Sequence, residues 1–311
     1  MIVCVAANPS VDKLFEVGEL RAGAIHRPES FVAVPGGKGL NVARAAAALG
    51  ARVTAVPLLA GHAGHWIDEA LAAEGVHAAP AWAQDGETRS SLSVADRETG
   101  RLTEFYEDGT PVTDRDWGAL EEALRSTVEG AAWVTLSGSA PPGTPEDAYA
   151  RMIHVGREAG ASVAVDARGP ALRHALDASP DLIKVNDAEA AEVVGGAVDT
   201  EADAIGAADD LVASSRGAAV AITRGRSGCV LVAGGVRLRG VVDATGPYPV
   251  GSGDSFLAGL VVGRERGSDW TDALRLAVGA AAANAEVPGA GRLSPERAAE
   301  LAGLAKISAI D

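Results

Sequence analysis

The sequence predicts an α/β fold in which helices cover both faces of a mainly parallel sheet. Short runs rich in β-branched residues alternate with Ala-rich stretches through most of the chain, and this alternation is typical of βα units. Several Ala-rich stretches end at a glycine, such as Gly50, Gly130 and Gly160, where a helix commonly stops. The 311 residues contain no internal repeat or low-complexity linker, so we expect a single domain over 1–311.

The individual elements follow from the same pattern. The predicted strands of the central sheet are 2–6, 52–57, 133–137, 162–166, 181–185, 219–223 and 229–233. The helices predicted between them are 41–49, 65–73, 116–128, 145–159, 188–194 and 202–215. Further helices are expected in close succession at 254–265, 270–285 and 295–304.

Two segments do not fit this alternation. Residues 88–106 alternate polar and apolar side chains around a turn at 96–100, which predicts a β-hairpin with one face in solvent. Residues 11–34 lack a helical period and are expected to be extended. Together, about 11–34 and 88–112 are predicted to form a small separate sheet that covers part of the main domain.

Composition and charge disfavour several classes of function. The net charge is −15, which argues against binding to nucleic acid or to an acidic membrane, because both need a basic surface. No apolar run reaches the length of a transmembrane helix, and the first residues read as a strand rather than a signal peptide. We therefore expect a cytoplasmic protein in which Cys4 and Cys229 are reduced core thiols. No GxGxxG follows a predicted strand, which disfavours a dinucleotide-dependent oxidoreductase.

The motif VGSGDS at 250–255 is the strongest local signal for chemistry. Gly251 and Gly253 allow successive backbone N–H groups to point the same way, and the helix that follows adds the positive end of its dipole. Such a loop can neutralise a phosphoryl group during its transfer. Asp254 lies in the predicted first turn, where its carboxylate can accept a proton from an attacking hydroxyl. The alternative is that Asp254 only caps the helix.

Two further motifs lie near the start of the chain. In PGGKGLN at 35–41, three glycines permit close approach of a ligand, Lys38 offers a cation and Asn41 offers an amide. The glycine spacing differs from that of a Walker A loop, and the alternative is a tight turn with a solvated lysine. In NPSVD at 8–12, Asp12 follows the first strand and suits sugar hydroxyls, although an Asx turn after the strand is the better explanation of this motif taken alone.

The segment KVNDAE at 184–189 marks the change from a strand to a helix. Asn186 and Glu189 are three residues apart and can both face a metal–phosphate group. Locally, a capping pair with Asn186 as N-cap and Glu189 at the third helical position is an equally good explanation.

Taken in order, these segments resemble the ribokinase/PfkB family of carbohydrate kinases. The resemblance rests on NPSVD, PGGKGLNVARA, TLSGSAPPG at 135–143, DLIKVNDAE at 181–189 and VGSGDSFLAG at 250–259, which together span nearly the whole chain. Within the family, the first three are similar to the branch that contains 1-phosphofructokinase, tagatose-6-phosphate kinase and the minor 6-phosphofructokinase. The chain departs from the usual pattern at Arg224, at Arg226 and in the segment 245–249.

The resemblance implies a ribokinase-like three-layer α/β/α fold in which the two irregular segments form a β-sheet lid. It implies ATP and Mg²⁺ as cofactors, Asp254 as catalytic base, and an anion hole at Gly251, Ser252 and Gly253. The implied substrate-binding residues are Asp12, Gly36, Gly37, Lys38, Asn41, Arg89 and Ser137. The implied nucleotide-binding residues are Lys184, Asn186, Thr223, Gly225, Gly228 and Asn284, with Glu189 at the metal.

The resemblance also implies partners. Arg89 is expected to contact a phosphate of the substrate from the lid, and Arg27 matches another recurrent lid arginine. Because the lid of this family often pairs with a partner's lid, we expect a homodimer. The leading hypothesis is a kinase of a ketohexose monophosphate, either fructose 1-phosphate or tagatose 6-phosphate. The alternatives are a kinase of an unphosphorylated sugar or nucleoside on the same fold, and a sugar-binding sensor without catalysis.

Overall fold

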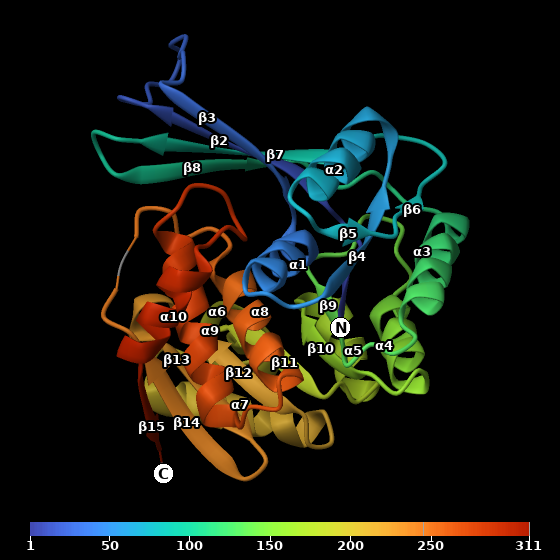
Figure 1. Cartoon of the computed structure of the whole chain (residues 1–311), viewed down its shortest axis with the longest axis vertical. Coiled ribbons are helices and arrows are strands. Elements are labelled where there is room, and N and C mark those ends of the chain that lie inside the picture. Colours follow the sequence, from blue (N-terminus) through green and yellow to red (C-terminus); the bar gives the residue numbers. More distant parts are fainter. Residues whose placement is uncertain (245, 311) are drawn as a thin grey trace.

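A mainly parallel sheet forms the centre of the protein in the computed structural model, which describes residues 1–244 and 246–310 (Figure 1). The described residues form an 11-stranded sheet in the order β15-β14-β13-β12-β11-β10-β9-β1-β4-β5, with β6 beside β4. The strands from β4 to β12 pair in parallel, and those from β12 to β15 pair antiparallel. The bounds are β1 Ile2–Ala6, β4 Val53–Leu59, β5 His77–Ala78, β6 Ala81–Trp82, β9 Trp133–Ser137, β10 Ser162–Asp166, β11 Leu182–Asn186, β12 Ala219–Thr223, β13 Cys229–Ala233, β14 Val236–Val241 and β15 Lys306–Ala309.

Helices cover both faces of this sheet, and strand β1 shows why. All five of its residues are buried, and alternate side chains enter different hydrophobic clusters, as expected for a parallel strand with both faces covered. One cluster includes residues of α1 (Lys38–Ala48), α2 (Gly61–Ala73), α8 (Ser252–Glu265), α9 (Trp270–Ala285) and α10 (Pro295–Leu304). The other includes residues of α3 (Asp114–Thr127), α4 (Ala148–Glu158), α5 (Gly169–Asp177), α6 (Asp187–Val194) and α7 (Glu201–Ser214).

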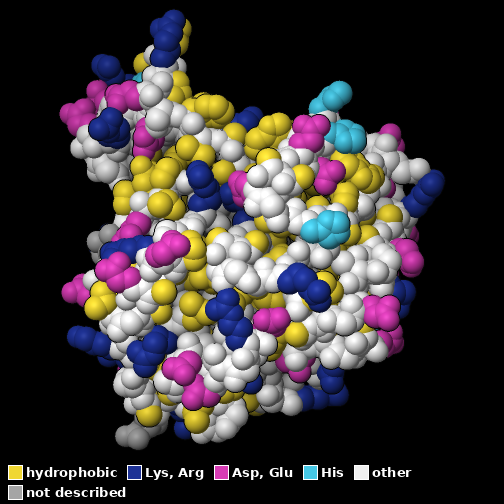
Figure 2. Space-filling view, in the orientation of Figure 1, with side chains coloured by type: hydrophobic (Ala, Val, Ile, Leu, Met, Phe, Trp, Pro, Cys, Tyr) yellow, Lys and Arg dark blue, Asp and Glu magenta, His cyan; other side chains and the backbone are white. Residues whose placement is uncertain are grey.

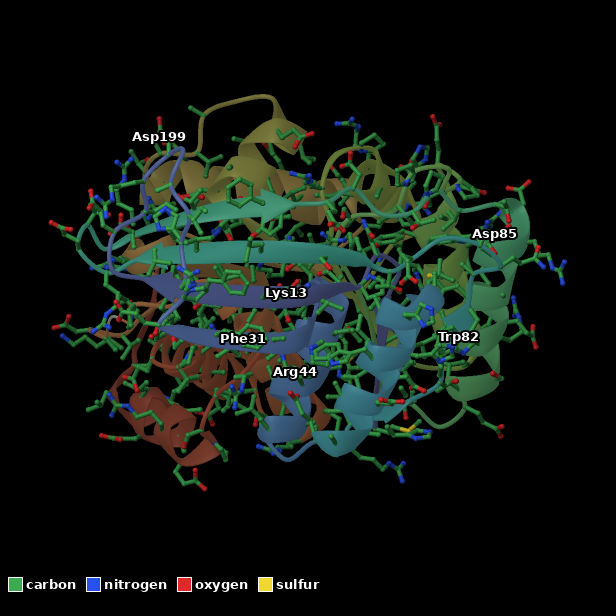
Figure 3. The ribbon with its side chains drawn as sticks, turned by 90° about the horizontal axis from the view of Figure 1, so that it is seen from above. Lys13, Phe31, Arg44, Trp82, Asp85 and Asp199 are labelled. Carbon is green, nitrogen blue, oxygen red and sulfur yellow. The ribbon has the colours of Figure 1, made fainter. Side chains whose placement is uncertain are left out.

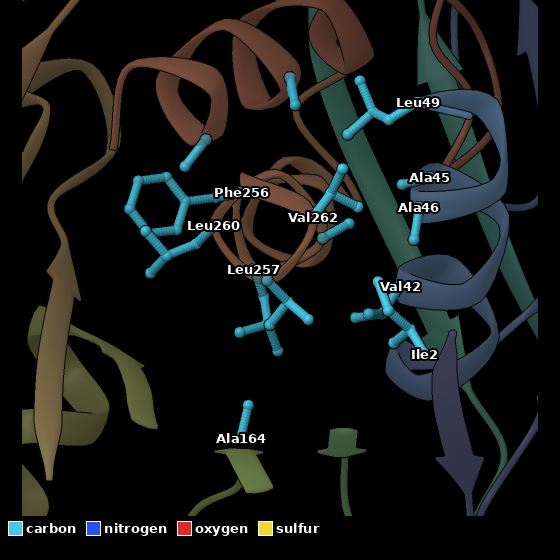
Figure 4. Packing of buried hydrophobic residues seen from close by; sticks show 14 of the residues in the cluster. Ile2, Val42, Ala45, Ala46, Leu49, Ala164, Phe256, Leu257, Leu260 and Val262 are labelled. Carbon is cyan, nitrogen blue, oxygen red and sulfur yellow. The ribbon is translucent and has the colours of Figure 1, made fainter. Parts of the chain in front are cut away.

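Small residues bring the helices that carry the site close together. Figure 4 shows Ala45 and Ala46 of α1 on the side of that helix that faces α8. On α8, a Cβ at Gly259 would lie 2.7 Å from the Cα of Ala277, and one at Gly263 would lie 2.7 Å from the Cα of Ala273. Helix α8 therefore meets α9 at backbone contact and has α1 on another side, which fixes the position of its first turn.

A second sheet projects from the top of the molecule and forms the lid (Figure 1). Its order is β3-β2-β7-β8, with β2 and β7 parallel and the outer pairs antiparallel. The bounds are β2 Ser10–Val17, β3 Ser30–Gly36, β7 Arg89–Asp96 and β8 Arg101–Tyr106. The Tyr248 hydroxyl of the main body donates to Glu16 Oε1 of β2 at 2.7 Å, so the lid and the body are linked directly.

The predicted architecture is confirmed, with differences at particular elements. Helix α5 was not predicted, although proline at the start of a helix is favourable. Helix α1 begins at Lys38 rather than at 41, since Gly37 serves as its N-cap. The short or terminal strands β5, β6, β14 and β15 were also missed. Among the described residues, every helix is too short or too polar to cross a lipid bilayer.

The tryptophans of α3 and α2 provide a test of the core. Trp117 is fully buried in the cluster beneath α3, whereas Trp66 on α2 is 37% exposed. Trp117→Ala leaves a large cavity and should lower the free energy of unfolding by about 3–5 kcal/mol, while Trp66→Ala should cost about 1 kcal/mol or less. Urea titration followed by circular dichroism measures both values, and equal losses would contradict this assignment of the core.

Candidate active site

Polar and charged side chains converge where the parallel strands end, beneath the lid. The first turns of α1, α6 and α8 begin at this edge of the sheet, which is where open α/β sheets bind ligands. The cleft between lid and body is lined from the lid by Asp12, Ser91 and Tyr106, and from the body by Tyr248, Val250 and Ala290. In the space-filling view of Figure 2, hydrophobic side chains gather where the lid meets the body.

A fully buried carboxylate, Asp166, stands at the end of β10 and organises the charges of the site. Its Oδ1 accepts a hydrogen bond from Lys38 Nζ at 2.7 Å, and its Oδ2 accepts one from Lys184 Nζ at 2.8 Å. Burial alone would raise the pKa of Asp166, but the two ammonium groups outweigh it and lower that pKa. Asp166 was not among the predicted site residues; its only signal in the sequence was an acidic residue at the end of a predicted strand.

Lys38, at the start of α1, is paired with two carboxylates. Its ammonium group also donates to Glu189 Oε1 at 2.9 Å. Burial alone would lower the pKa of Lys38, but attraction to Asp166 and Glu189 outweighs it and raises that pKa. Both contacts of Lys38 lie toward β10 and α6, and its role as a sugar-binding cation stays a prediction.

Asp254 lies in the first turn of α8, as predicted, and is 6% exposed. Its Oδ2 accepts a hydrogen bond from Asn41 Nδ2 at 2.8 Å. Burial, reinforced by repulsion from Asp166, raises the pKa of Asp254 to about 6, although Lys38 and Lys184 oppose the shift. The alternative that Asp254 caps the helix is wrong, because Gly251 is the N-cap and makes no side-chain bond.

The loop before Asp254 presents free amide groups. Gly251 has a φ of +82°, a left-handed conformation that favours glycine. In the described part of the chain, the N–H groups of Gly253 and Asp254 donate to no protein acceptor, whereas that of Ser252 donates to Pro249 O at 3.1 Å. The N–H of Gly251 also donates to no acceptor in the described residues, so the free donors include Gly251 and Gly253 of the predicted set, and they lie at the positive end of α8.

Asn284 supports this loop from behind. Its Nδ2 donates to Val250 O at 2.9 Å, and its Oδ1 accepts from Gly291 N at 2.8 Å and from Ser255 Oγ at 3.0 Å. The side chain is fully buried. Its polar atoms are therefore used inside the protein, where they support the loop, and its contact with a nucleotide stays a prediction.

On the lid side, Asp12 lies next to the glycines that precede α1. Its Oδ1 accepts from Ser10 Oγ at 2.5 Å, and its Oδ2 accepts from Gly37 N at 3.4 Å. Burial raises the pKa of this carboxyl group. A Cβ at Gly36 would lie 2.0 Å from Asp12 Cγ, so only glycine leaves room for Asp12 at this point.

Arg89 is half-buried at the start of β7, close to Asp12. Its guanidinium group donates to Asn8 O at 3.3 Å and to Ser91 Oγ at 3.0 Å. Ser137 ends β9, and its buried Oγ has no partner among the described residues. Arg27, by contrast, is exposed to solvent on the connection between β2 and β3.

The residues expected around the nucleotide lie along β11 and β12. Asn186 and Thr223 pair in register at the ends of these strands, and Gly225 and Gly228 flank a short 3₁₀ turn just beyond. Asn186 and Glu189 form a capping box at the start of α6, which confirms that alternative without excluding a ligand role. Lys184 is buried under the loop, since a Cβ at Gly253 would lie 2.9 Å from its Nζ.

Arg224 and Arg226, which depart from the usual pattern, do not add charge to the centre of the site. Arg224 Nη2 donates to Asp199 O at 2.9 Å, and Arg226 is exposed. The cations at the centre are therefore Lys38 and Lys184, both paired with Asp166.

Comparisons with known proteins agree with this geometry. The chain is 32% identical over 278 residues to 1-phosphofructokinase of Rhodobacter capsulatus, covering 89% of this chain and 87% of the relative. Phosphofructokinase-2 from Escherichia coli in complex with substrates and products superimposes with a TM-score of 0.90 at 27% identity, covering 97% and 98% of the two chains. Ribokinase of Arabidopsis thaliana shares the fold, with a TM-score of 0.75 at 21% identity over 97% and 98%.

The sequence profile described as pfkB family carbohydrate kinase matches residues 3–297, nearly the whole chain. This confirms the ribokinase-like fold and the family that the motifs indicated. The chain belongs to the pfkB family of carbohydrate kinases.

Proposed function

We propose that the protein transfers the γ-phosphoryl group of ATP to a hydroxyl of a ketohexose monophosphate and forms a bisphosphate. Fructose 1-phosphate and tagatose 6-phosphate are the leading substrates. The observation that carries the proposal is a buried carboxylate, Asp254, beside free amides at the positive end of α8. The relative named 1-phosphofructokinase supports the choice of sugar.

The chemistry follows from these groups. The sugar hydroxyl gives its proton to Asp254 while its oxygen forms a bond to the γ-phosphorus, and the bond to the β-phosphate oxygen breaks with its electron pair leaving on ADP. The N–H groups of Gly253 and Asp254 face the charge that develops on the phosphoryl oxygens. Asn41 holds Asp254 by its 2.8 Å hydrogen bond, so the base is oriented before the sugar arrives.

Magnesium fits this site as a companion of the nucleotide. Within residues 1–244 and 246–310, no three His, Cys, Asp or Glu side chains are grouped to hold a metal ion by themselves. Mg²⁺ commonly binds through phosphate oxygens and water with one or two carboxylates, and Glu189 is the carboxylate placed for it beside Lys38. When bound, the ion would neutralise charge on the transferring phosphates.

Selectivity for a phosphorylated sugar is assigned to Arg89. Lys38 and Lys184 are already paired with Asp166, whereas the protein contacts of Arg89 are two backbone carbonyls and one serine hydroxyl. A substrate phosphate near Asp12 would give this guanidinium an anionic partner and help to offset the charge of an acidic chain.

We also propose a homodimer formed through the lid. Alternation along the strands puts Phe15, Phe31, Leu92 and Phe105 on one face of the lid. Phe31 is 60% exposed and Phe105 is 58% exposed, and Figure 3 looks down on this sheet with Phe31 labelled. An exposed aromatic face of this kind favours association with a second copy. A cytoplasmic location is proposed because ATP and sugar phosphates are available there.

Asp254→Asn tests the role of the base. The variant should fold and lose about 10²–10⁴ in kcat, because proton acceptance and charge placement are both impaired. In the wild type, kcat/KM should fall as the pH drops below about 6, where Asp254 becomes protonated. A coupled ADP-release assay with fructose 1-phosphate and tagatose 6-phosphate measures both, and undiminished turnover by the variant would remove Asp254 from its role.

The same substitution should also change the stability of the protein in a way that depends on pH. Folding raises the pKa of Asp254 from 3.8 to about 6, so the ionised carboxylate destabilises the native state above pH 6 and has no such effect below pH 3.8. Asp254→Asn should therefore be more stable than the wild type at pH 8 by up to about 3 kcal/mol, and this gain should vanish in acid. Asp85→Asn, which removes a carboxylate at an exposed position, is the matched control for the substitution.

Arg89→Ala tests the class of sugar. Loss of a charge-assisted hydrogen bond should raise KM for a phosphosugar about ten- to hundredfold and leave KM for a neutral sugar or nucleoside nearly unchanged. Arg101→Ala, at an exposed position of the neighbouring strand, is the matched control. An unchanged KM for the phosphosugar favours the alternative kinase, and sugar-induced thermal stabilisation without ADP release by the wild type favours the sensor.

Phe31→Asp tests the lid interface. A charge on the apolar face should shift the protein from dimer to monomer in sedimentation velocity, because the aspartate would be desolvated in the interface. Val236→Asp, which alters a residue 43% exposed on β14 of the other sheet, should leave the dimer intact. A wild type that sediments as a monomer, or a Phe31→Asp dimer, would contradict the proposal.

A further inference from the structure

We infer that Arg44 is a positioning residue that holds the loops on the two sides of Asp254 in register. Arg44 lies in α1, beneath the lid in the view of Figure 3, and is 3% exposed. Its Nη1 donates to Pro35 O at 3.2 Å and to Ala290 O at 2.7 Å. The inference rests on the proposed function for its kinetic consequences, although not for its structural ones.

The two carbonyl groups belong to segments that form the site. Pro35 immediately precedes Gly36 and Gly37, which lie against Asp12. Ala290 packs against the N-cap of α8, since a Cβ at Gly251 would lie 2.7 Å from its Cα. A single guanidinium nitrogen, Nη1 of Arg44, therefore joins the segment before Gly36, next to Asp12, to the segment that packs against Gly251 at the N-cap of α8.

The segment at Ala290 is wedged so tightly that a small displacement would be transmitted to the site. A Cβ at Gly291 would lie 2.7 Å from Asn41 Cα, and Gly291 N–H donates to Asn284 Oδ1 at 2.8 Å. Asn41 holds Asp254, and Asn284 holds the loop at Val250. Loss of the hydrogen bond from Arg44 to Ala290 O would therefore loosen the contacts that position Asp254 and the loop at Val250.

The remaining nitrogens of Arg44 explain why an arginine occupies this position. Nε and Nη2 donate to the two carboxylate oxygens of Glu74 at 2.5 Å and 2.9 Å, so the buried charge is paired bidentately. A lysine ammonium has no planar fork and does not reproduce this pairing together with both carbonyl bonds. Glu74 itself, at the end of α2, is partly exposed and touches neither loop through these bonds.

Along α1, the polar residues are spaced to serve the site together. Lys38, Asn41 and Arg44 recur at intervals of three, which places them on adjacent turns of one side of the helix. Lys38 contacts Asp166, Asn41 contacts Asp254, and Arg44 contacts the two loops. The same helix thus positions the buried charges, the base and the backbone around it.

The test compares Arg44→Lys and Arg44→Met with Glu74→Gln. The methionine variant is included because an apolar side chain of similar length avoids burying an unpaired charge. Both Arg44 variants should speed amide hydrogen exchange in peptides covering 33–37 and 287–292, and should lower kcat/KM for the sugar phosphate about ten- to hundredfold. KM for ATP should change less than about twofold, because Arg44 does not contact the residues expected around the nucleotide.

Glu74→Gln should lower Tm while leaving the exchange of both loops and kcat/KM near wild type. If the Arg44 variants behave like Glu74→Gln, with a lower Tm but unchanged loop exchange and kinetics, Arg44 has only a structural role and the inference is wrong. Hydrogen exchange needs no substrate, so it still decides the role of Arg44 if the wild type fails to phosphorylate ketohexose phosphates, a result that would overturn the proposed function alone.

Discussion

The buried ion pairs of Asp166 are the interaction on which the rest of the site depends. This carboxylate is fully buried and joins Lys38 at the start of α1 to Lys184 of β11. A buried charge is costly unless it is paired and hydrogen-bonded, so the strand ends and helix starts that carry these groups must keep a fixed geometry. The position of α1 relative to the sheet, and with it the positions of Asn41 and Arg44, follows from these bonds.

The charges around Asp166 also set the state of Asp254. Two ammonium groups face the carboxyl groups of Asp166, Glu189 and Asp254, so an ionised Asp254 brings one more negative charge than the lysines balance. Burial, together with repulsion from Asp166, is why the pKa of Asp254 lies near 6. A base in this range is ionised at neutral pH and still accepts a proton readily, which suits general base catalysis.

Much of this arrangement could be predicted from the sequence, because its motifs lie at strand ends that a parallel sheet brings to one edge. The lid segments, the helix that begins after Gly251 and the place of Asp254 in its first turn were all predicted. The hydrogen-bond and ion-pair partners of each side chain could not be predicted from the sequence. Lys38 is separated from Asp166 by 128 residues and from Glu189 by 151, and no local pattern indicates such pairings.

The internal hydrogen bonds of Asn284 escaped prediction for the same reason. They depend on the contact between α9, the loop that follows it and the loop before α8, where glycines allow the backbones to touch. Local sequence shows that glycines are present and that close approach is possible, but not which groups approach. The tethers of Arg44 belong to this class of contacts, which only the folded structure defines.

The pKa of Asp254 in the free protein tests the central claim most directly. A ¹³C NMR titration of the aspartate carboxyl carbons, with the Asp254 signal assigned by its absence from Asp254→Asn, measures it. The buried charge cluster described above predicts a midpoint near 6. A midpoint at or below about 4, the value of an unperturbed aspartate, would show that the carboxylate is solvated and would contradict the arrangement of the site.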